Sequence, residues 1–204
     1  MKVCGLTGGI GTGKSTAARF LRERHIRLVD ADELARELVQ PGRPALVEIQ
    51  HVFGKEIISA DGRLRRDELA RIVFADTDAR KKLEAILHPP IREGWLAQLE
   101  TWRAAPKRSD GGRGENQPLA VVVIPLLFET KAESHFDRII CVACSAPTQR
   151  QRLLERGWTP EQIQQRLAAQ WPVDQKIARA DFVVWTDGSL AAHAEQLERI
   201  VARL

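Results

Sequence analysis

The sequence predicts an α/β fold in which helices wrap a five-stranded parallel sheet and a helical lobe is added to that core. Three observations favour this class. Short apolar runs alternate with amphipathic helical patterns, the order expected of strands joined by right-handed crossovers. Two of the runs, LAVVVIP and RIICVAC, are apolar throughout, as in strands that helices cover on both faces. Residues 41–105 read almost entirely as helix, which is too long for one crossover.

The N-terminal elements follow this alternation. A strand over Val3–Leu6 enters a glycine-rich loop, and a helix with one apolar stripe begins after Lys14. The run Ile26–Asp30 is expected to form the second strand, and the helix after it covers Glu33–Val39. Strands of a parallel sheet end at one common edge, so the loop and the end of the second strand are expected to face the same space.

The lobe is expected to consist of several helices. One of them carries a stripe that ends at Gly54, and a second begins with Asp67 as its cap. A third stops at the dipeptide Pro89-Pro90, because proline lacks the backbone donor that a helix interior needs. Pro90 then suits the first turn of a last helix, along which Trp95 and later apolar residues recur at helical spacing.

The remaining elements return to the alternation. The runs LAVVVIP and RIICVAC are the third and fourth strands, and DFVVW is the fifth. Thr159, Pro160 and Gln162 have the spacing of a helix start with a capping box. A closing helix is expected over Leu190–Leu204.

These elements divide the chain into a core of residues 1–40 and 119–204 and a lobe of residues 41–105. The lobe is expected to stand over the C-terminal edge of the sheet, where α/β sheets bind ligands. The polar, glycine-rich stretch at 106–118 predicts a flexible surface loop.

The composition is that of an ordinary soluble globular chain, with 44% hydrophobic and 28% charged residues. No apolar run approaches the roughly 20 residues of a membrane-spanning helix. Glycines and Lys14 also interrupt the apolar start that a secretory signal needs, so we expect a cytoplasmic protein without a membrane partner. The net charge of +4 mixes 31 basic with 27 acidic residues, without the clustering that a nucleic-acid partner requires.

Three cysteines are too few for a disulfide framework. Cys141 and Cys144 form a C-x-x-C pattern, but residues three apart on a strand point to opposite faces, and no second pair completes a zinc site. We therefore interpret both as small buried residues.

The glycine-rich segment GGIGTGKS, residues 8–15, matches the pattern G-x4-G-K-[ST] between a strand and a helix. Glycines let successive N–H groups turn inward to form a nest for phosphate oxygens, and the next helix points its positive end there. In this pattern Lys14 reaches the β- and γ-phosphates, and the Ser15 hydroxyl helps to hold Mg²⁺. The segment predicts nucleoside triphosphate binding, but it does not separate a GTPase switch, an ATPase motor and a small-molecule kinase.

The end of the second strand, LVDADELAR, supplies a carboxylate for chemistry. Asp32 lies just beyond the strand, where its side chain can accept the proton of an acceptor hydroxyl or orient that hydroxyl for in-line attack. Asp30 is the second candidate for this role. Asp32 could instead cap the helix Glu33–Val39, since aspartate is a common helix cap.

Seven stretches occur in the order and spacing seen in one enzyme family: GLTGGIGTGKST, VDADELAR, LHPPI, IPLLFE, TQRQRLLER, RLAAQ and ADFVV. The first is shared by many families, whereas DAD, HP and PLLFE at these positions are far more specific. On these motifs, which run from Val3 to about Ser189, the chain resembles the dephospho-CoA kinases. Members of that family phosphorylate the ribose 3′-hydroxyl of dephospho-CoA with ATP, the last step of coenzyme A synthesis.

The resemblance implies a P-loop kinase core, a substrate-binding lobe at 41–105 and a helical lid at about 147–172. It implies ATP with Mg²⁺ and dephospho-CoA as the small molecules bound. The helical lobe would then accept dephospho-CoA, and a monomer is expected.

Residue by residue, the resemblance makes Asp32 the catalytic aspartate and places Arg152 opposite the nucleotide phosphates, with Arg156 as a second candidate. A lid arginine supplies donors to the charge that spreads over phosphoryl oxygens, although single arginines are often only surface charges. His88 is expected near the junction of lobe and core, where it either touches substrate or ends a helix. The implied catalytic residues are Asp32, Lys14 and Arg152. The implied ATP-binding residues are Gly9, Gly11, Thr12, Gly13, Lys14, Ser15, Thr16, Arg152 and Arg156.

Some positions depart from the family or leave a role open. Thr186 stands where the family commonly has an asparagine near the adenine, so base contacts by that side chain are in doubt. The third strand ends at Pro125 rather than at a metal-assisting aspartate. Ser15 is therefore the clearest Mg²⁺ ligand, with phosphates, water and the assistance of Asp32. Glu129 is interpreted as an ordinary loop residue rather than a carboxylate near the metal.

Two alternatives remain from the residues alone. A nucleoside monophosphate kinase of similar architecture would differ only in what the helical lobe accepts. A nucleotide-dependent switch would bind GTP for a protein partner, but the fourth strand is followed by SAPTQRQR, which lacks the N-K-x-D segment that reads guanine.

Overall fold

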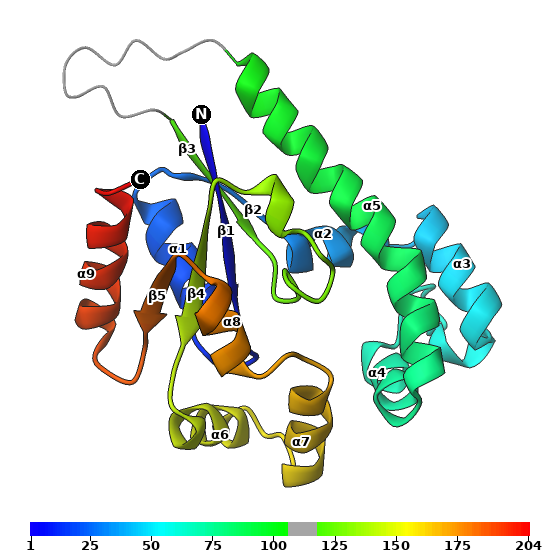
Figure 1. Cartoon of the computed structure of the whole chain (residues 1–204). Coiled ribbons are helices and arrows are strands. Elements are labelled where there is room, and N and C mark those ends of the chain that lie inside the picture. The colour runs from blue at the N-terminus through cyan, green and yellow to red at the C-terminus, as the bar shows by residue number, and fades with distance from the viewer. Residues whose placement is uncertain (106–117) are drawn as a thin grey trace. The chain divides into compact units, whose positions relative to one another are not determined.

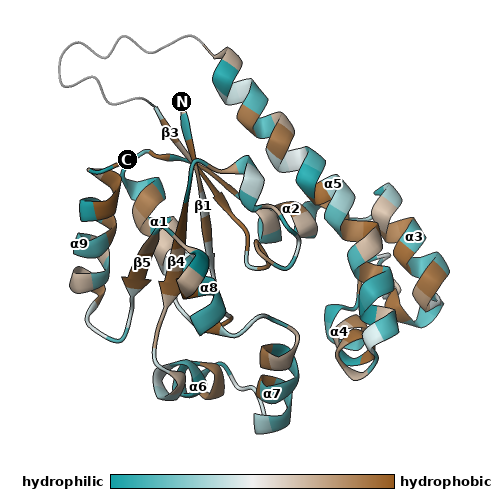
Figure 2. Ribbon diagram, viewed as in Figure 1, coloured by the Kyte–Doolittle hydropathy of each residue, from teal (hydrophilic) through white to brown (hydrophobic). Residues whose placement is uncertain are grey.

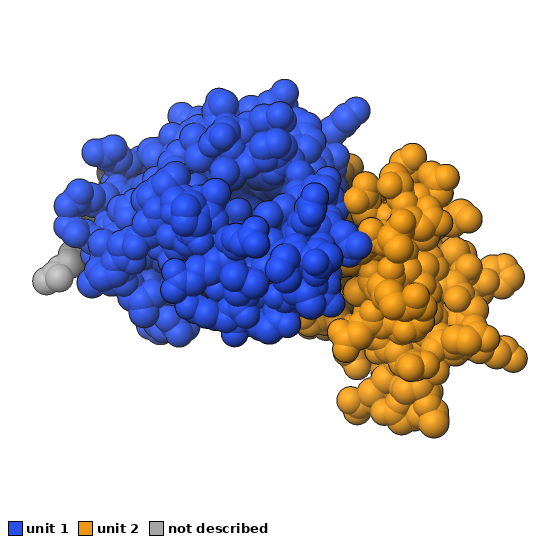
Figure 3. All heavy atoms as spheres, turned by 90° about the horizontal axis from the view of Figure 1, so that it is seen from below, with its two compact units in different colours: residues 1–29, 98–204 blue, residues 30–97 orange. Residues whose placement is uncertain are grey.

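The computed structural model describes residues 1–105 and 118–204, so the loop expected at 106–118 lies almost wholly outside the described residues. The chain forms two compact units, one of residues 1–29 and 98–204 and the other of residues 30–97 (Figure 3). These limits differ from those expected at 40 and 105. Helix α2 (Ala31–Leu38) groups with the second unit because it packs on α3 (Pro44–Phe53).

The first unit is built on a five-stranded sheet, which confirms the predicted fold class. Its strands are β1 (Lys2–Gly8), β2 (Arg27–Asp30), β3 (Leu119–Val123), β4 (Arg138–Ala143) and β5 (Phe182–Trp185). Their order across the sheet is β2-β3-β1-β4-β5, and β1 pairs in parallel with β3 and β4 (Figure 1). The phosphate-loop strand β1 therefore lies at the centre, where its C-terminal end has a neighbouring strand end on each side.

The central strands are buried because helices pack on the sheet. Apolar residues dominate β3 and β4 (Figure 2), and nearly all of their side chains are buried. Helices α1 (Lys14–Glu23) and α9 (Leu190–Val201) contact each other, and α8 (Val173–Arg179) contacts β1 and β4. The core of this unit comprises Cys4, Leu6, Ala17, Ala18, Leu21, Val121, Val123, Ile140, Val142, Val184, Leu197 and Ile200.

Two further helices precede α8. Helix α6 (Ala146–Glu155) is capped by Ser145, and α7 (Pro160–Ala168) begins with the predicted capping box, in which the Thr159 and Gln162 side chains bond each other's backbone N–H. The short helix α8 has no counterpart among the predicted elements. A 3-10 turn, η2 (Glu133–His135), lies before β4.

The second unit is helical, as expected of the lobe. Besides α2 and α3 it contains η1 (Lys55–Ile57), α4 (Arg66–Ala75) and the first part of α5 (Thr77–Ala104). Its own core consists of Val39, Ala45, Leu46, Ile49, Ile57, Leu69, Val73 and Ile86. The predicted cap of α4 is wrong by two residues, because Arg65 occupies the cap position and Asp67 lies in the first helical turn.

Helix α5 contradicts the prediction that one helix stops at Pro89-Pro90 and another starts there. It is one helix of 28 residues with both prolines inside it (Figure 1). A proline inside a helix costs about 3 kcal/mol, since it removes a hydrogen bond and crowds the preceding turn. Buried side chains on either side, Ile86 before the prolines and Trp95 after them, supply packing that offsets this cost.

The cysteines behave as predicted. Cys4, Cys141 and Cys144 are buried free thiols. Burial raises the pKa of the Cys141 thiol to about 11, so it stays protonated and unreactive at neutral pH. Among the described residues, no helix is both long and apolar enough to cross a membrane.

Candidate active site

The glycine-rich loop leaves the C-terminal end of β1 and runs into α1. Gly8 is required by space, because a Cβ there would stand 2.2 Å from the Val142 carbonyl oxygen. Gly13 is required by conformation, because its φ of +101° lies in the left-handed region at the cap of α1. Both positions therefore require glycine for the turn that the loop makes between β1 and α1.

Lys14, the first residue of α1, lies against this loop. Its Nζ donates hydrogen bonds to the carbonyl oxygens of Gly8 at 2.8 Å and Gly9 at 2.7 Å. The buried Thr12 hydroxyl also donates to the Gly9 carbonyl, at 2.8 Å. The loop is therefore held by its own lysine and threonine, with the ammonium charge already at the phosphate-binding turn.

The tip of the loop is held from outside by two glutamines. The Ile10 N–H donates to the Gln170 side-chain oxygen at 3.0 Å, and the Gln149 amide donates to the Ile10 carbonyl at 2.6 Å. Gln149 lies on α6, and Gln170 lies between α7 and α8. The segment predicted as a lid is thus joined to the phosphate loop at both of these points.

Arg152, on α6, is connected to the loop through hydrogen bonds of Thr186. Its guanidinium donates to the Thr186 hydroxyl at 2.9 Å and to the Thr186 carbonyl at 2.5 Å. The Thr186 hydroxyl in turn donates to the Thr12 carbonyl at 2.8 Å. Thr186 is 3% exposed, so the residue in the family's asparagine position links the loop to the arginine.

A cavity of about 160 Å³ opens where these elements meet. Its walls come from the loop and the start of α1, from α6 and its C-terminus, and from the turn between β5 and α9. The lining residues are Gly11, Gly13, Thr16, Arg152, Arg156, Thr186, Gly188, Ser189, Leu190 and His193. Five of the residues proposed to bind ATP, Gly11, Gly13, Thr16, Arg152 and Arg156, therefore share one cavity.

The strand-end aspartates lie in the second unit, and their local roles differ. The Asp30 carboxylate caps α2, since it accepts a hydrogen bond from the Asp32 N–H at 2.8 Å. Burial raises the pKa of Asp30. Asp32 is exposed in the first turn of α2. The alternative in which Asp32 caps this helix is therefore wrong, and its carboxylate is available for another task.

His88 does not end a helix, which corrects one of the two roles expected of it. It lies half-buried in the interior of α5. Burial lowers the pKa of its imidazole, the Arg92 charge lowers it further and the Glu84 charge opposes the shift. A contact with substrate remains as its expected role.

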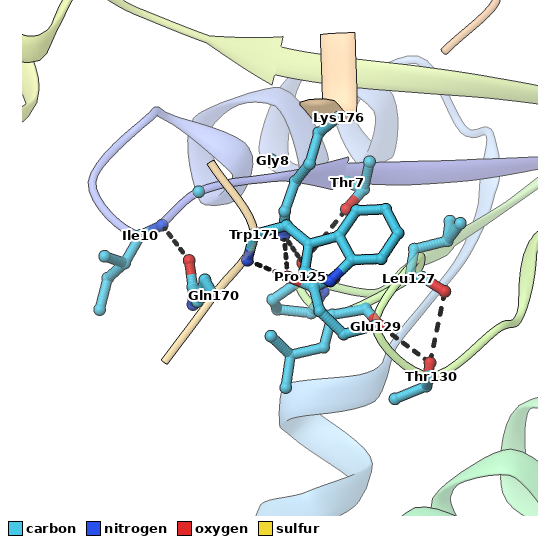
Figure 4. Close-up of polar contacts among 12 residues, drawn as sticks. Thr7, Gly8, Ile10, Pro125, Leu127, Glu129, Thr130, Gln170, Trp171 and Lys176 are labelled. Atoms are coloured by element: carbon cyan, nitrogen blue, oxygen red, sulfur yellow. Dashed lines mark hydrogen bonds and ion pairs between the residues drawn. The ribbon is translucent and has the colours of Figure 1, made fainter. Parts of the chain in front are cut away.

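A buried ion pair lies beneath the phosphate loop (Figure 4). Lys176, whose side chain is 0% exposed, donates to Glu129 and to the Pro125 carbonyl, both at 2.8 Å. The Trp171 N–H donates to the same Glu129 oxygen at 2.8 Å, and the Thr7 hydroxyl donates to the Pro125 carbonyl at 3.2 Å. Glu129 therefore lies in a loop, as interpreted, and has in addition the structural role of pairing with a buried lysine.

Sequence reasoning missed four contributors to this region, namely Gln149, Gln170, Lys176 and His193. Their partners lie far away in the chain, and a lone glutamine or lysine carries no motif. The burial of Lys176, which requires a carboxylate partner, is evident only from the structure.

The residues present fit a bound Mg²⁺ only as part of a nucleotide complex. Residues 1–105 and 118–204 contain no cluster of three or more His, Cys, Asp or Glu side chains that could hold a metal by themselves. Ser15 is exposed at the start of α1, where its hydroxyl oxygen is a ligand of the kind that Mg²⁺ prefers. Mg²⁺ usually keeps several waters and takes substrate phosphate oxygens, so one protein ligand is compatible with this chemistry.

Comparison with known proteins agrees with the geometry. The model of the dephospho-CoA kinase family matches residues 2–192. A dephospho-CoA kinase from Anaeromyxobacter dehalogenans is 46% identical over 205 residues, which cover 100% of this chain and 92% of the relative. A Thermus thermophilus crystal structure aligns with a TM-score of 0.78 and 32% identity, covering 100% of this chain and 97% of the other.

The solved dephospho-CoA kinase from Campylobacter jejuni aligns with a TM-score of 0.68 and 25% identity, again covering 100% of this chain and 97% of the other. Each of these matches spans both units rather than the phosphate loop alone. The chain therefore belongs to the dephospho-CoA kinase family, whose members are ATP-dependent kinases.

Proposed function

We propose that this protein is a dephospho-CoA kinase, which transfers the γ-phosphate of ATP to the ribose 3′-hydroxyl of dephospho-CoA and yields coenzyme A and ADP. The observation that supports ATP as the phosphate donor is the phosphate loop, in which Lys14 bonds to the carbonyl of Gly8. Similarity over the full chain to the kinase family supports the reaction class and the acceptor.

The loop forms the phosphate end of the ATP site. Its N–H groups and the N-terminus of α1 bind the phosphates, and Lys14 supplies the positive charge. The lysine ammonium exchanges the neutral carbonyls of Gly8 and Gly9 for phosphate oxygens, because charge-assisted hydrogen bonds are the stronger ones. Gly9, Gly11, Thr12, Gly13, Ser15 and Thr16 complete this end of the site.

Two arginines stabilise the transferring group. Arg152 and Arg156 line the same cavity as the loop residues Gly11 and Gly13. During transfer, negative charge spreads over the phosphoryl oxygens, and guanidinium donors placed beside them lower the barrier. Arg152 is the principal candidate because Thr186 orients its guanidinium, whereas Arg156 is exposed at the end of α6.

Asp32 acts on the acceptor. Its carboxylate accepts the proton of the ribose 3′-hydroxyl while that oxygen attacks the γ-phosphorus, and the bond from this phosphorus to the ADP oxygen breaks. The proton then passes to solvent. Asp32 suits the role because its carboxylate is exposed and is not used as a helix cap, which Asp30 provides.

Mg²⁺ is the metal that the residues fit, with Ser15 as protein ligand, Asp32 assisting, and nucleotide phosphates and water as the other ligands. When bound, it neutralises charge on the β- and γ-phosphates. We further propose that the helical unit of residues 30–97 accepts dephospho-CoA, with His88 as a contact. The protein is proposed to work as a monomer in the cytoplasm, without nucleic-acid or membrane partners.

The proposal is tested by offering the protein dephospho-CoA, AMP and CMP separately with MgATP and measuring coenzyme A, ADP and CDP by chromatography. We expect turnover with dephospho-CoA alone. Preferred phosphorylation of AMP or CMP would contradict it in favour of a nucleoside monophosphate kinase. Tight GTP binding with no acceptor-dependent turnover would instead point to a switch. The Lys14→Ala protein, purified identically, controls for contaminating kinases.

A further inference from the structure

One buried polar atom beside the ATP cavity has no assigned role. His193 lies near the start of α9 and is 3% exposed. Its Nε2 atom is buried and has no hydrogen-bond partner in the part of the chain that the structure describes. Buried polar atoms in folded proteins almost always have a partner, and one without a partner costs stability. A partner supplied by a bound molecule accounts for such an atom.

His193 lines the cavity beside the phosphate loop. Its Cε1 atom is 3.6 Å from the position that a Cβ would take at Gly13, so the ring lies against the junction of loop and helix. On its other side the ring meets Phe20 edge to face, with the ring centroids 5.4 Å apart. The imidazole thus lies between Phe20 and the cavity beside the phosphate loop.

Two of the polar side chains beside His193 already have partners, and the Ser189 hydroxyl is one of them because it accepts from the Ala192 N–H. The Thr186 hydroxyl already donates to the Thr12 carbonyl and accepts from Arg152. Gly188 offers no side chain, and Leu190 offers an apolar one that is 62% exposed at the cavity. The cavity thus combines the apolar side chain of Leu190 with polar groups of the loop, of α6 and of α9, and ligand pockets commonly combine apolar surface with a few polar groups in this way.

The imidazole is in the right state for such a contact. Burial and the nearby Arg152 charge lower the pKa of His193, so the ring is neutral at pH 7. A neutral imidazole presents one donor and one acceptor, and a purine edge carries both kinds of partner. The torsion about the Cβ–Cγ bond has a broad, roughly two-fold preference. A half-turn of the ring therefore places Nε2 where Cε1 now lies, beside Gly13.

We infer that His193 is the side chain that hydrogen-bonds the purine base of the phosphate donor, in a pocket walled by Leu190 and Gly188. The inference rests on the proposed function for the identity of that donor as ATP. It assigns a binding residue to the nucleoside end of the site, which the phosphate-loop motif does not reach. In this position a histidine takes over base recognition, while Thr186 is committed to holding the loop and Arg152.

The test separates the base from the phosphates. Binding of ATP and of inorganic tripolyphosphate, which has no base, is measured by calorimetry for the wild type and for His193→Phe, which keeps an aromatic ring beside Phe20. We expect the affinity for ATP to fall about tenfold, the equivalent of one hydrogen bond, and the affinity for tripolyphosphate to stay unchanged. His51→Phe, a change at an exposed histidine of α3, should alter neither.

A second variant and a second readout protect the test against a folding defect. His193→Gln keeps a donor and an acceptor and should restore part of the ATP affinity. In the absence of nucleotide, His193→Phe should melt at the wild-type temperature or above, because the unpartnered nitrogen is gone, but ATP should raise its melting temperature less. Unchanged ATP affinity in His193→Phe, or equal losses for ATP and tripolyphosphate, would overturn the inference.

Steady-state kinetics distinguish this inference from the proposed function. In the dephospho-CoA assay, His193→Phe should raise the KM for ATP about tenfold and leave the KM for dephospho-CoA and kcat unchanged. If the wild type forms no coenzyme A while its ATP binding still depends on His193, the proposed function fails and the inference stands. If the protein makes coenzyme A and its KM for ATP does not depend on His193, the inference fails and the proposed function stands.

Discussion

The phosphate loop and the segment that covers it, residues 146–176, are held in place by different means. The loop combines local bonds from Lys14 and Thr12 with backbone requirements, since Gly8 has no room for a side chain and Gly13 has a left-handed conformation. The covering segment is held by side-chain contacts. Gln149 and Gln170 bond to the loop, and Lys176 forms an ion pair with Glu129. Backbone requirements restrict residue type locally, whereas side-chain contacts depend on partners far apart in the sequence.

The largest effect is expected from removing the loop's charge. Lys14→Ala should lower kcat/KM with MgATP and dephospho-CoA by roughly a thousandfold, because both ATP binding and transition-state charge lose their cation. The fold should persist, since the loop is also held by the Thr12 hydroxyl and by the side chains of Gln149 and Gln170. Steady-state rates and circular dichroism check both parts. A Lys14→Ala protein with near wild-type kcat/KM would contradict the role given to the loop in this comparison.

The second-largest effect is expected from breaking the ion pair between Lys176 of the covering segment and Glu129. Lys176→Met leaves the Glu129 carboxylate buried without its cation and should lower the free energy of unfolding by about 3 kcal/mol, measured with urea. Adding Glu129→Gln should restore much of this, because no buried charge is then left unpaired. Lys81→Met, which removes an ion pair whose lysine is 69% exposed, is the control and should change little. Equal losses for both lysines would show that burial does not matter.

Arg152 joins the two regions and should have an effect on catalysis rather than on folding. Arg152→Ala is expected to lower kcat by on the order of a hundredfold, as the loss of one preorganised donor typically does. Arg150→Ala, an exposed arginine on the same helix, should leave kcat unchanged. Rapid-quench measurement of the transfer step checks the difference. If both variants match the wild type, the arginine is a surface charge.

The smallest expected effect is on the pH dependence of the free energy of unfolding. Burial lowers the pKa of both His88 and His193, so the folded protein binds these protons more weakly than the unfolded chain does. Below about pH 6.5, the ordinary histidine value, the unfolded chain therefore holds more protons, and stability is lost as pH falls through the depressed pKa values. Urea unfolding at several pH values should show a shallower slope for His193→Phe. An unchanged slope would mean that His193 does not contribute to this pH dependence.

The fold was predictable because its elements carry local signals. Apolar β-branched runs indicated β3 and β4, and the Thr159–Gln162 spacing indicated the start of α7. The continuous α5 was not predictable from its own residues, because Pro89-Pro90 is a strong local break that only packing around Ile86 and Trp95 can outweigh. Helix α8 was missed because seven residues are too few for a clear period.

The candidate site divides in the same way. The G-x4-G-K-S segment identified the phosphate loop because spacing alone encodes a backbone nest. Thr186 stands out in the sequence as a departure, yet its bond to the Thr12 carbonyl depends on β5 ending beside the loop, a contact across 174 positions. His193 offered no signal, because a lone histidine on an amphipathic helix is indistinguishable from a packed one until its partners are known.

The central claim is that a phosphate-binding loop and the carboxylate of Asp32 serve one transfer reaction. The most direct measurement is the single-turnover rate of phosphate transfer in Asp32→Asn, with ATP affinity measured in parallel and Asp30→Asn as the matched control that keeps the helix cap. We predict a loss of about a hundredfold or more in rate for Asp32→Asn, unchanged ATP affinity, and a near wild-type rate for Asp30→Asn. A wild-type rate in Asp32→Asn would contradict the account.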